Sequence, residues 1–316
     1  MNRKQLLRQG LHMTAAGAYV ASVRGKALAQ STGKLRVAGI PNDIGCASAY
    51  AYEQGFFKKY GLDVELVVGG TGASVAAAVV GGALDVGSGN TASIATAHER
   101  GVPFVMIAPS GAWSAKSPTG ALLVAKSSPI TSVKQLAGKV IGITLVRGIS
   151  EVECRALLDQ NGADSGSAKF LEIPYSAMSA ALEAGRIDAA SAEEPAYSNI
   201  MSQGNVRSIG IPGDAIAPLW VEGGYFVLDS FAKAHPDIVT KFANAMAETD
   251  DWANKNPVAS ARILSKYTNA PVDPKMVRCF YPERLRAEDL QPLIDASAKY
   301  GILKASFPAK ELLAST

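Results

Sequence analysis

Cysteine and long apolar runs are both scarce in this sequence. The three cysteines, Cys46, Cys154 and Cys279, lie far apart and have no metal-ligand spacing. At most one disulfide can form within the chain, so the fold must be stable largely without one. After the first 29 residues, no stretch is long and apolar enough for a transmembrane helix. These absences argue against a disulfide framework, a cysteine metal site and a helical membrane span.

Histidine is equally rare. His12 lies in the N-terminal stretch, which leaves His98 and His235, the latter directly before Pro236 in a predicted helix break. Neither has the spacing of a catalytic triad or of a metal site. Because catalysis needs a nucleophile, a base or a metal cluster and none is legible, we predict that the protein is not an enzyme and uses no metal or cofactor.

Acidic residues are missing from the first 29 positions. The stretch carries five positive charges, Arg3, Lys4, Arg8, Arg24 and Lys26. Residues 9–23 form an uncharged run too short to span a bilayer, and Ala-Leu-Ala at 27–29 has the small-x-small form of a signal-peptidase site. We therefore predict a signal peptide at residues 1–29 and a periplasmic location. Residues 2–7 also approximate a twin-arginine signal, so both export routes stay open.

Once this signal is removed, the chain is not basic. Lysine plus arginine falls from 31 to 26 against 28 acidic residues, and the net charge moves from +3 to −2. Phosphate contacts need clustered lysine and arginine. Nucleic acid and anionic membranes are therefore not expected as the main partners.

The rest of the chain alternates between strand and helix patterns. Strands are predicted at residues 35–40, 62–68, 83–86, 103–108, 121–125, 140–144, 170–173, 187–191, 206–211 and 223–228. Helices are predicted at residues 47–60, 74–80, 91–100, 132–137, 150–161, 176–184 and 195–201, with a further run of helices to the end. This alternation predicts an α/β fold with parallel or mixed sheets and helices on both faces. At the length that remains after the signal is removed, a single hydrophobic core often divides into two domains, so we expect two lobes.

Two strands mark the passages between the expected lobes. Residues 121–125 and 223–228 are each flanked by turn chemistry where one α/β set gives way to another. We predict lobe 1 at residues 30–122 plus 227–316 and lobe 2 at residues 123–226, joined by a two-strand hinge. Ligands of open α/β sheets bind beyond the carboxyl ends of strands, so a cleft between the lobes is the expected site.

Polar side chains follow several predicted strands at the turns that would face this cleft. The candidates are Asn42, Asp43, Thr71, Ser74, Ser88, Asn90 and Thr91 in the first lobe and Thr144, Arg147 and Ser150 in the second. Exposed N–H groups at helix starts and the Arg147 guanidinium would suit an anionic or carbonyl oxygen. Turn formation, helix capping and a solvated surface arginine are the competing interpretations.

Four segments carry a family resemblance, and their order and spacing are more specific than any one of them. They are residues 53–65, 82–87, 128–142 and 181–189, with Glu194-Pro195 after the last. In these segments the chain resembles the periplasmic substrate-binding proteins of ABC importers, specifically the nitrate/sulfonate/taurine and thiamine-precursor binding family. The resemblance implies a type II periplasmic-binding-protein fold that closes on a small molecule and then docks on a membrane permease. We expect a monomer.

The resemblance also points to particular residues. Members of the family usually contact ligand where Asn42 and Asp43 lie, and commonly at the place of Glu193 and Glu194. One of these glutamates would accept from a ligand N–H while the other caps a helix, and Glu222 beside the second passage could be a hinge contact. Two aromatic residues, Trp113 and Tyr175, would either stack on a flat ligand or belong to the core.

Three alternatives stay open. Arg147 favours an acidic ligand and the glutamates favour one that donates hydrogen bonds, so an amphoteric ligand would satisfy both. Some enzymes of pyrimidine and menaquinone biosynthesis share the fold, but the cysteine-rich motif of the pyrimidine-forming enzymes is absent. A periplasmic sensor-input protein would use the same trap and cannot be separated from a transport protein by this sequence.

Overall fold

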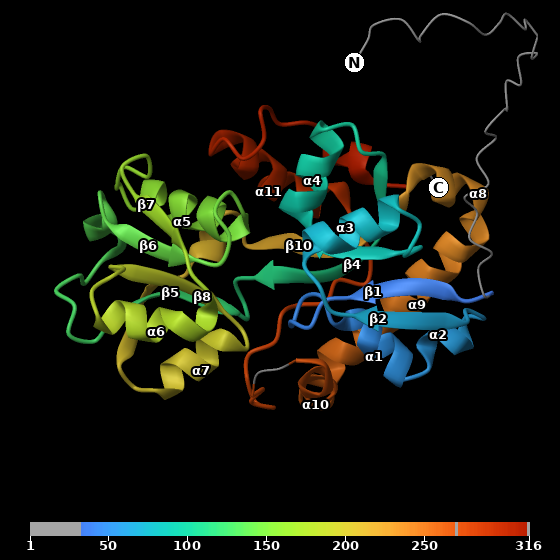
Figure 1. Ribbon diagram of the computed structural model, residues 1–316, viewed down its shortest axis with the longest axis horizontal. Coiled ribbons are helices and arrows are strands. Elements are labelled where there is room, and N and C mark those ends of the chain that lie inside the picture. The colour runs from blue at the N-terminus through green and yellow to red at the C-terminus, as the bar shows by residue number, and fades with distance from the viewer. Residues whose placement is uncertain (1–32, 269–270, 315–316) are drawn as a thin grey trace, which may run out of the picture. The chain divides into compact units, whose positions relative to one another are not determined.

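The computed structural model describes residues 33–268 and 271–314. The predicted signal peptide lies outside these residues. Within them, no helix has both the length and the apolar character needed to cross a membrane. The expected mixture of helices and strands is confirmed (Figure 1).

The first set of strands forms two sheets. The strands are β1 (Leu35–Gly39), β2 (Val64–Val68), β3 (Gly87–Asn90), β4 (Phe104–Ser114) and β10 (Leu219–Leu228). Strands β1 and β2 pair in parallel, and β10 lies between β3 and β4 and is antiparallel to both. A single parallel bridge between Val37 and Val86 joins β1 to the segment that leads into β3.

The second set of strands forms one five-stranded sheet with the order β7-β6-β8-β5-β9. The strands are β5 (Gly120–Ala125), β6 (Val140–Ile143), β7 (Lys169–Glu172), β8 (Ala189–Glu193) and β9 (Val206–Gly210). Strand β6 is parallel to β7 and β8, whereas β5 is antiparallel to β8 and β9. The carboxyl ends of β6 and β8 therefore lie at the same edge of this sheet.

Helices cover both faces of the sheets. The α-helices are α1 (Ala47–Glu53), α2 (Phe56–Lys59), α3 (Gly72–Val80), α4 (Thr91–Glu99), α5 (Ile149–Gln160), α6 (Tyr175–Glu183), α7 (Ala196–Ser202), α8 (Asp229–Ala234), α9 (Pro236–Lys255), α10 (Pro257–Tyr267) and α11 (Ala287–Lys299). The short 3₁₀ helices are η1 (Val133–Leu136), η2 (Pro212–Ala215) and η3 (Ala309–Leu312).

Alternating side chains of β5 explain how the five-stranded sheet is covered. Leu122 and Val124 pack in one cluster with α5, and Ala121 and Leu123 pack in another with α6 and α7. Figure 1 shows α5 on one side of this sheet and α6 and α7 on the other. Because successive side chains of a strand point to opposite faces, a strand buried on both faces must be apolar throughout, as β5 is.

Two long strands hold the core of the other sheets. Tyr225 and Val227 of β10 pack with α1 and α9, while Val221 and Phe226 pack with α3, α4 and α11. Gly224 allows β10 to lie close to β4, since a Cβ there would be 2.4 Å from Met106 Cε and 2.8 Å from the Ala108 carbonyl oxygen. The chain leaves this sheet after β4 and returns to it with β10.

Some element boundaries differ from the predicted ones. The helix expected at residues 47–60 is divided into α1 and α2 at Gly55, whose φ of 75° no regular helix allows. The strand expected at residues 83–86 forms instead at Gly87–Asn90, where Gly87 leaves room for the Phe226 ring 2.4 Å from its missing Cβ. The predicted passages 121–125 and 223–228 lie inside β5 and β10, and the lobe boundaries stay a prediction.

Candidate ligand-binding site

A cavity of about 790 Å³ lies where segments attached to both sets of strands meet. The turn after β1 contributes residues 41–44, the start of α6 contributes residues 174–176, and the chain from the end of β8 into α7 contributes residues 193–196. Thr119, Pro271 and Cys279 complete much of the wall. A cavity of this size is ample for a small organic molecule.

One carboxylate in the cavity wall is neutralised by a buried arginine. Asp43 Oδ1 accepts a hydrogen bond of 2.6 Å from Arg278 Nε, and Asp43 Oδ2 accepts one of 2.8 Å from the Cys279 backbone N–H. Tyr281 Oη lies 3.0 Å from Asp43 Oδ1, and Arg278 also donates to Tyr50 Oη at 2.8 Å. Both charged side chains are almost fully buried. The charge of Asp43 is thus paired and its oxygens are satisfied.

A second carboxylate in the wall, that of Glu194, has hydrogen-bond donors but forms no ion pair within residues 33–268 and 271–314. Glu194 Oε1 lies 2.6 Å from Ser198 Oγ, and Glu194 Oε2 accepts from the Ser198 backbone N–H at 3.2 Å. Burial raises the pKa of Glu194, and the hydrogen bonds from Ser198 oppose that rise. Glu194 therefore stabilises the start of α7, the role that the sequence suggested for one of the two adjacent glutamates.

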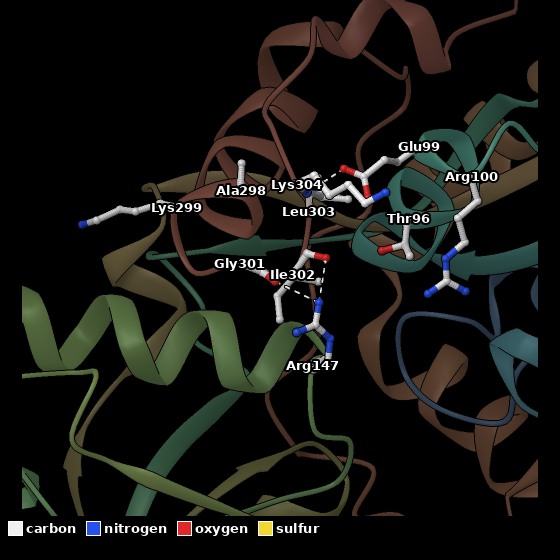
Figure 2. Close-up of a pocket in the computed structure, with 10 residues that line it drawn as sticks. All are labelled: Thr96, Glu99, Arg100, Arg147, Ala298, Lys299, Gly301, Ile302, Leu303 and Lys304. Carbon is white, nitrogen blue, oxygen red and sulfur yellow. Dashed lines mark hydrogen bonds between the residues drawn. The ribbon is translucent and has the colours of Figure 1, made fainter.

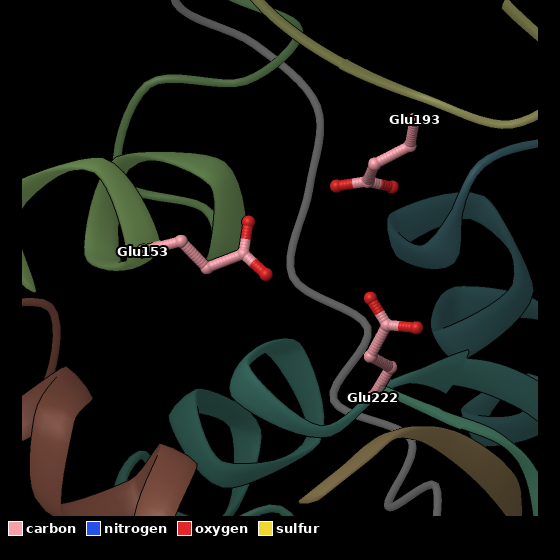
Figure 3. Close-up of side chains that lie close together, drawn as sticks. All are labelled: Glu153, Glu193 and Glu222. Carbon is pink, nitrogen blue, oxygen red and sulfur yellow. The ribbon is translucent and has the colours of Figure 1, made fainter. Parts of the chain in front are cut away.

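Three further carboxylates converge beside the cavity (Figure 3). Glu153 extends from α5, Glu193 from the end of β8 and Glu222 from β10. One oxygen of each lies within 4.8 Å of one oxygen of each of the others. Glu153 and Glu222 are 3% and 2% exposed, and Glu193 is partly buried and lines the cavity. We call these three residues the carboxylate cluster.

All three carboxyl groups of the cluster have raised pKa values. Burial raises the pKa of Glu153 and of Glu222 well above the ordinary value, and the charge of Glu193 raises both further. Burial also raises the pKa of Glu193, although a hydrogen bond from Tyr175 works in the opposite direction. Among the described side chains, no partner is found for Glu222 Oε2. Like charges this close, removed from water, strongly disfavour full ionisation of all three.

Arg147 lines a different and smaller pocket of about 410 Å³ (Figure 2). Its backbone has a φ of 61°, and its Nη2 donates to the carbonyl oxygens of Gly301 at 2.8 Å and Ile302 at 3.2 Å. Arg100 and Lys304 also line this pocket. The guanidinium thus binds backbone after α11 and does not line the 790 Å³ cavity.

The structure brings five of the predicted site residues together in the wall of the larger cavity. They are Asn42, Asp43, Tyr175, Glu193 and Glu194. The other nine do not line it, and they are Thr71, Ser74, Ser88, Asn90, Thr91, Trp113, Thr144, Arg147 and Ser150. The assignment of all fourteen as ligand-binding residues stays a prediction.

Capping accounts for several of these nine. Thr71 and Ser74 form a reciprocal capping box at the start of α3, and Asn90 Oδ1 accepts from the Ser93 N–H at 2.7 Å to cap α4. Thr91 Oγ1 donates to the Val221 carbonyl oxygen at 2.8 Å, which ties α4 to β10. The sequence left a capping role open beside ligand binding for Ser74.

The two aromatic candidates lie in different surroundings. Trp113 stacks on Trp220 with ring centroids 6.5 Å apart, and its Nε1 donates to Asp214 Oδ1 at 3.0 Å. A Cβ on Gly213 would lie 2.3 Å from the Trp113 ring, so this indole is enclosed. Tyr175 lines the cavity together with Glu193, whose pKa the Tyr175 hydroxyl lowers. Tyr175 is therefore placed to meet a ligand, whereas Trp113 supports the core.

Sequence reasoning missed Glu153 and Arg278 and proposed only a hinge contact for Glu222. A signal for Glu222 was present, because it is a lone charge within the otherwise apolar strand Leu219–Leu228. Glu153 follows Glu151 on α5 and looks like an ordinary helix surface charge. Arg278 lies in irregular chain far from Asp43 in the sequence, and no local pattern announces their pairing.

The described cysteines offer no chemistry to the cavity. All three are unpaired and buried, which answers the question of a disulfide for Cys46, Cys154 and Cys279. Burial raises the pKa of Cys46 to about 12 and moves the pKa of Cys154 and Cys279 upward as well. A thiol with a raised pKa stays protonated and is a poor nucleophile.

Sequence comparisons identify relatives of this chain. The family model described as NMT1/THI5 like matches residues 46–260. The taurine-binding periplasmic protein of Escherichia coli strain K12 is 26% identical over 206 residues, which cover 64% of this chain and 61% of that protein. The match thus spans about three-fifths of the length of this relative.

Solved structures share the fold at lower identity. The periplasmic aliphatic sulphonate binding protein SsuA from Escherichia coli is 19% identical, with a TM-score of 0.72 over 90% of this chain and 93% of that chain. The periplasmic nitrate-binding protein NrtA from Synechocystis PCC 6803 is 15% identical, with a TM-score of 0.69 over 89% and 84%. The desulfurization enzyme DSZB is 14% identical, with a TM-score of 0.65 over 89% and 96%. The predicted type II periplasmic-binding-protein fold is confirmed.

Proposed function

This chain belongs to the NMT1/THI5 like family, and from that premise we propose that it is the exported solute-binding component of an ABC importer. It captures one small organic molecule in the 790 Å³ cavity and delivers it to a permease in the inner membrane. The capture involves no chemistry. Export to the periplasm and function as a monomer are part of this proposal.

The observation that carries the proposal is the composition of the cavity wall. Asn42 and Asp43 come from the turn after β1. Tyr175 begins α6 and Glu193 ends β8, and both of these elements belong to the five-stranded sheet and its covering helices. A ligand that contacts both sets of elements binds more tightly when they are close together, so it favours a closed state by its differential affinity. A ligand held by one set alone would bind without changing the surface that a permease reads.

The enzyme alternative has weaker support, although DSZB is an enzyme with this fold. Cys279 is the only thiol among the residues recorded in the cavity wall, and its raised pKa keeps it protonated. Neither of the two described histidines lines this wall, because His98 lies beside Phe307 and Glu311 and His235 lies beside Phe231. The described lining therefore holds neither a histidine base nor a readily ionised thiol.

A ligand screen on the protein without residues 1–29 tests the proposal. Sulfonates, carboxylates, amides and pyrimidines would be compared by thermal shift, because a ligand that binds only the folded state raises its stability, by about 2.7 kcal/mol at 100 times its Kd. Small-angle scattering with and without a confirmed ligand would then measure closure. We expect one class of solute to stabilise the protein and to make its scattering envelope more compact.

A pair of variants localises the binding. Ala196→Phe would fill part of the cavity, because Ala196 lines it at the start of α7. Ala234→Phe makes the same change at an exposed position of α8. Affinity should fall in the first variant and stay unchanged in the second. Equal affinity in both, an unchanged envelope, or turnover of the solute would contradict the proposal.

A further inference from the structure

We propose that the ligand carries a protonated amine and that the carboxylate cluster of Glu153, Glu193 and Glu222 holds it. This inference rests on the proposed function and specifies the class of solute. The ammonium group would sit among the three carboxylates, and the remainder of the molecule would occupy the 790 Å³ cavity that Glu193 lines.

The spacing of the oxygens suits an ammonium group. At the upper limit of 4.8 Å between each pair, a point at the centre of the triangle is 4.8/√3, or about 2.8 Å, from each oxygen. Hydrogen bonds from a charged nitrogen to a carboxylate have lengths of roughly 2.7–2.9 Å. An ammonium group has three donors, so a single group can reach one oxygen of each glutamate.

The cluster also lacks the partner that such charges normally have. No lysine, arginine or histidine of the described chain forms an ion pair with Glu153, Glu193 or Glu222 among the recorded pairs. Independently of the clustering, Glu222 Oε2 is buried with no hydrogen-bond partner in residues 33–268 and 271–314, and Figure 3 shows its carboxylate turned toward the other two. Buried carboxylates are costly to ionise unless they are paired, so an added cation would allow the cluster to ionise.

The cluster communicates with the cavity through Glu193. Glu193 and Tyr175 line the cavity, and the Tyr175 hydroxyl lowers the pKa of Glu193. Glu153 and Glu222 are more deeply buried and do not line it. An amine at one end of a ligand would meet Glu193 at the cavity wall, and an oxygen of Glu193 lies within 4.8 Å of an oxygen of Glu153 and of Glu222. Ile44 and Ala196 would contact the less polar body of the ligand.

A protein-bound divalent metal fits the cluster less well. Calcium takes six to eight oxygen ligands and magnesium demands an octahedron at about 2.0–2.1 Å. The cluster offers three residues, all of them carboxylates, with neither histidine nor cysteine for a softer metal. Metal binding at the cluster is therefore the competing result that the experiment must distinguish.

The test compares solutes that differ only in the amine. Suitable pairs are taurine and 2-hydroxyethanesulfonate, 5-aminopentanoate and 5-hydroxypentanoate, and benzylamine and benzyl alcohol. Isothermal titration of the protein without residues 1–29 should show the amine of at least one pair binding about tenfold more tightly or better, since hydrogen bonds between charged groups are stronger than those between neutral ones. Glu153→Gln and Glu222→Gln should each abolish that preference.

Glu151→Gln is the matched control. Glu151 is a buried glutamate of the same helix, but it pairs with Arg155 at 2.8 Å and is not part of the cluster. This variant should keep the amine preference. Thermal unfolding would confirm that all three variants are folded, so a lost preference could not be attributed to misfolding.

Several results would overturn the inference. Solutes that bind with equal affinity whether they carry an amine or a hydroxyl would refute it while leaving the proposed function intact. Binding of calcium, magnesium, manganese or zinc that Glu222→Gln abolishes, without any amine preference, would assign the cluster to a metal instead. A complete failure of every solute in both screens would count against the proposed function as well.

Discussion

Asp43 and Glu222 are both buried carboxylates near the same cavity, yet the protein treats them in opposite ways. Asp43 has an arginine, a backbone N–H and a tyrosine hydroxyl around its two oxygens. Glu222 has two other glutamates nearby and an oxygen without a partner in the described residues. A paired carboxylate such as Asp43 has a structural role, whereas an unpaired one such as Glu222 can still form an ion pair with a ligand.

Removing the partner of Asp43 should have the largest effect. Arg278→Met would leave a buried aspartate without its ion-pair partner and should lower the free energy of unfolding by about 3–5 kcal/mol. Denaturant unfolding would measure the loss. The control is Arg286→Met, because Arg286 forms only an exposed contact of 3.9 Å with Glu288 and such pairs contribute about 0–1 kcal/mol. The added change Asp43→Asn should recover part of the loss, and a failure to recover any would mean that the pair is not the cause.

Neutralising Glu222 should act in the opposite direction in the ligand-free protein. Glu222→Gln removes a buried carboxyl group whose charged form the folded state disfavours, so we expect the free energy of unfolding at pH 7 to rise by about 1–3 kcal/mol. The gain comes from the native state, where burial and then the charges of Glu193 and Asp43 raise the pKa of Glu222. A loss of stability in this variant would show that the carboxylate has a favourable role already without ligand.

The same substitution predicts a pH dependence with a definite sign. Since the pKa of Glu222 is higher in the folded than in the unfolded state, the folded protein binds more protons, and stability falls as pH rises. This penalty is absent below the unfolded value of about 4.3 and grows until pH exceeds the folded pKa. The advantage of Glu222→Gln over the parent should therefore grow from acid to neutral pH. Thermal unfolding of both proteins across that range would show it.

Sequence patterns predicted the architecture because they depend on near neighbours. Strand β5 was recognisable from an apolar run, and α3 from Thr71 and Ser74, whose reciprocal cap lies within four residues. The family resemblance likewise rests on local segments. The lobe boundaries that follow from these patterns stay a prediction.

The charges around the cavity were much harder to foresee. Asp43 and Arg278 are separated by 235 positions, and Glu153, Glu193 and Glu222 come from three different elements. Whether a charge is paired depends on such long-range placement, which no local pattern encodes. The sequence did give two hints, the isolated glutamate in β10 and the adjacent pair Glu193 and Glu194, and only the structure separates the paired charges from the unpaired ones.

Asp250 tests whether an unpaired buried carboxylate away from the cavity affects stability without affecting solute affinity. It lies in α9, is fully buried, and has no partner for either oxygen within the described chain, and burial raises its pKa well above the usual value. Asp250→Asn should raise the free energy of unfolding by about 1–2 kcal/mol. Because Asp250 does not line the cavity, titration should show unchanged solute affinity. A loss of affinity equal to that in Glu222→Gln would mean that buried charge acts globally.

Glu194 is the intermediate case, and its prediction is the smallest. It has hydrogen bonds from Ser198 but no charge partner among the recorded ion pairs of the described residues. Ser198→Ala removes the hydroxyl donor at 2.6 Å and keeps the backbone N–H, so the free energy of unfolding at pH 7 should fall by about 1 kcal/mol. In the parent protein the Ser198 hydroxyl lowers a pKa that burial raises, so the pKa of Glu194 should rise further in the variant. The difference in stability between variant and parent should therefore shrink as pH falls. Ser265→Ala is the control, because Ser265 bonds only to the Arg262 carbonyl oxygen on an exposed helix turn. Equal losses of stability with the same pH profile in the two variants would contradict this prediction. They would mean that the Ser198 hydroxyl does not stabilise the ionised form of Glu194.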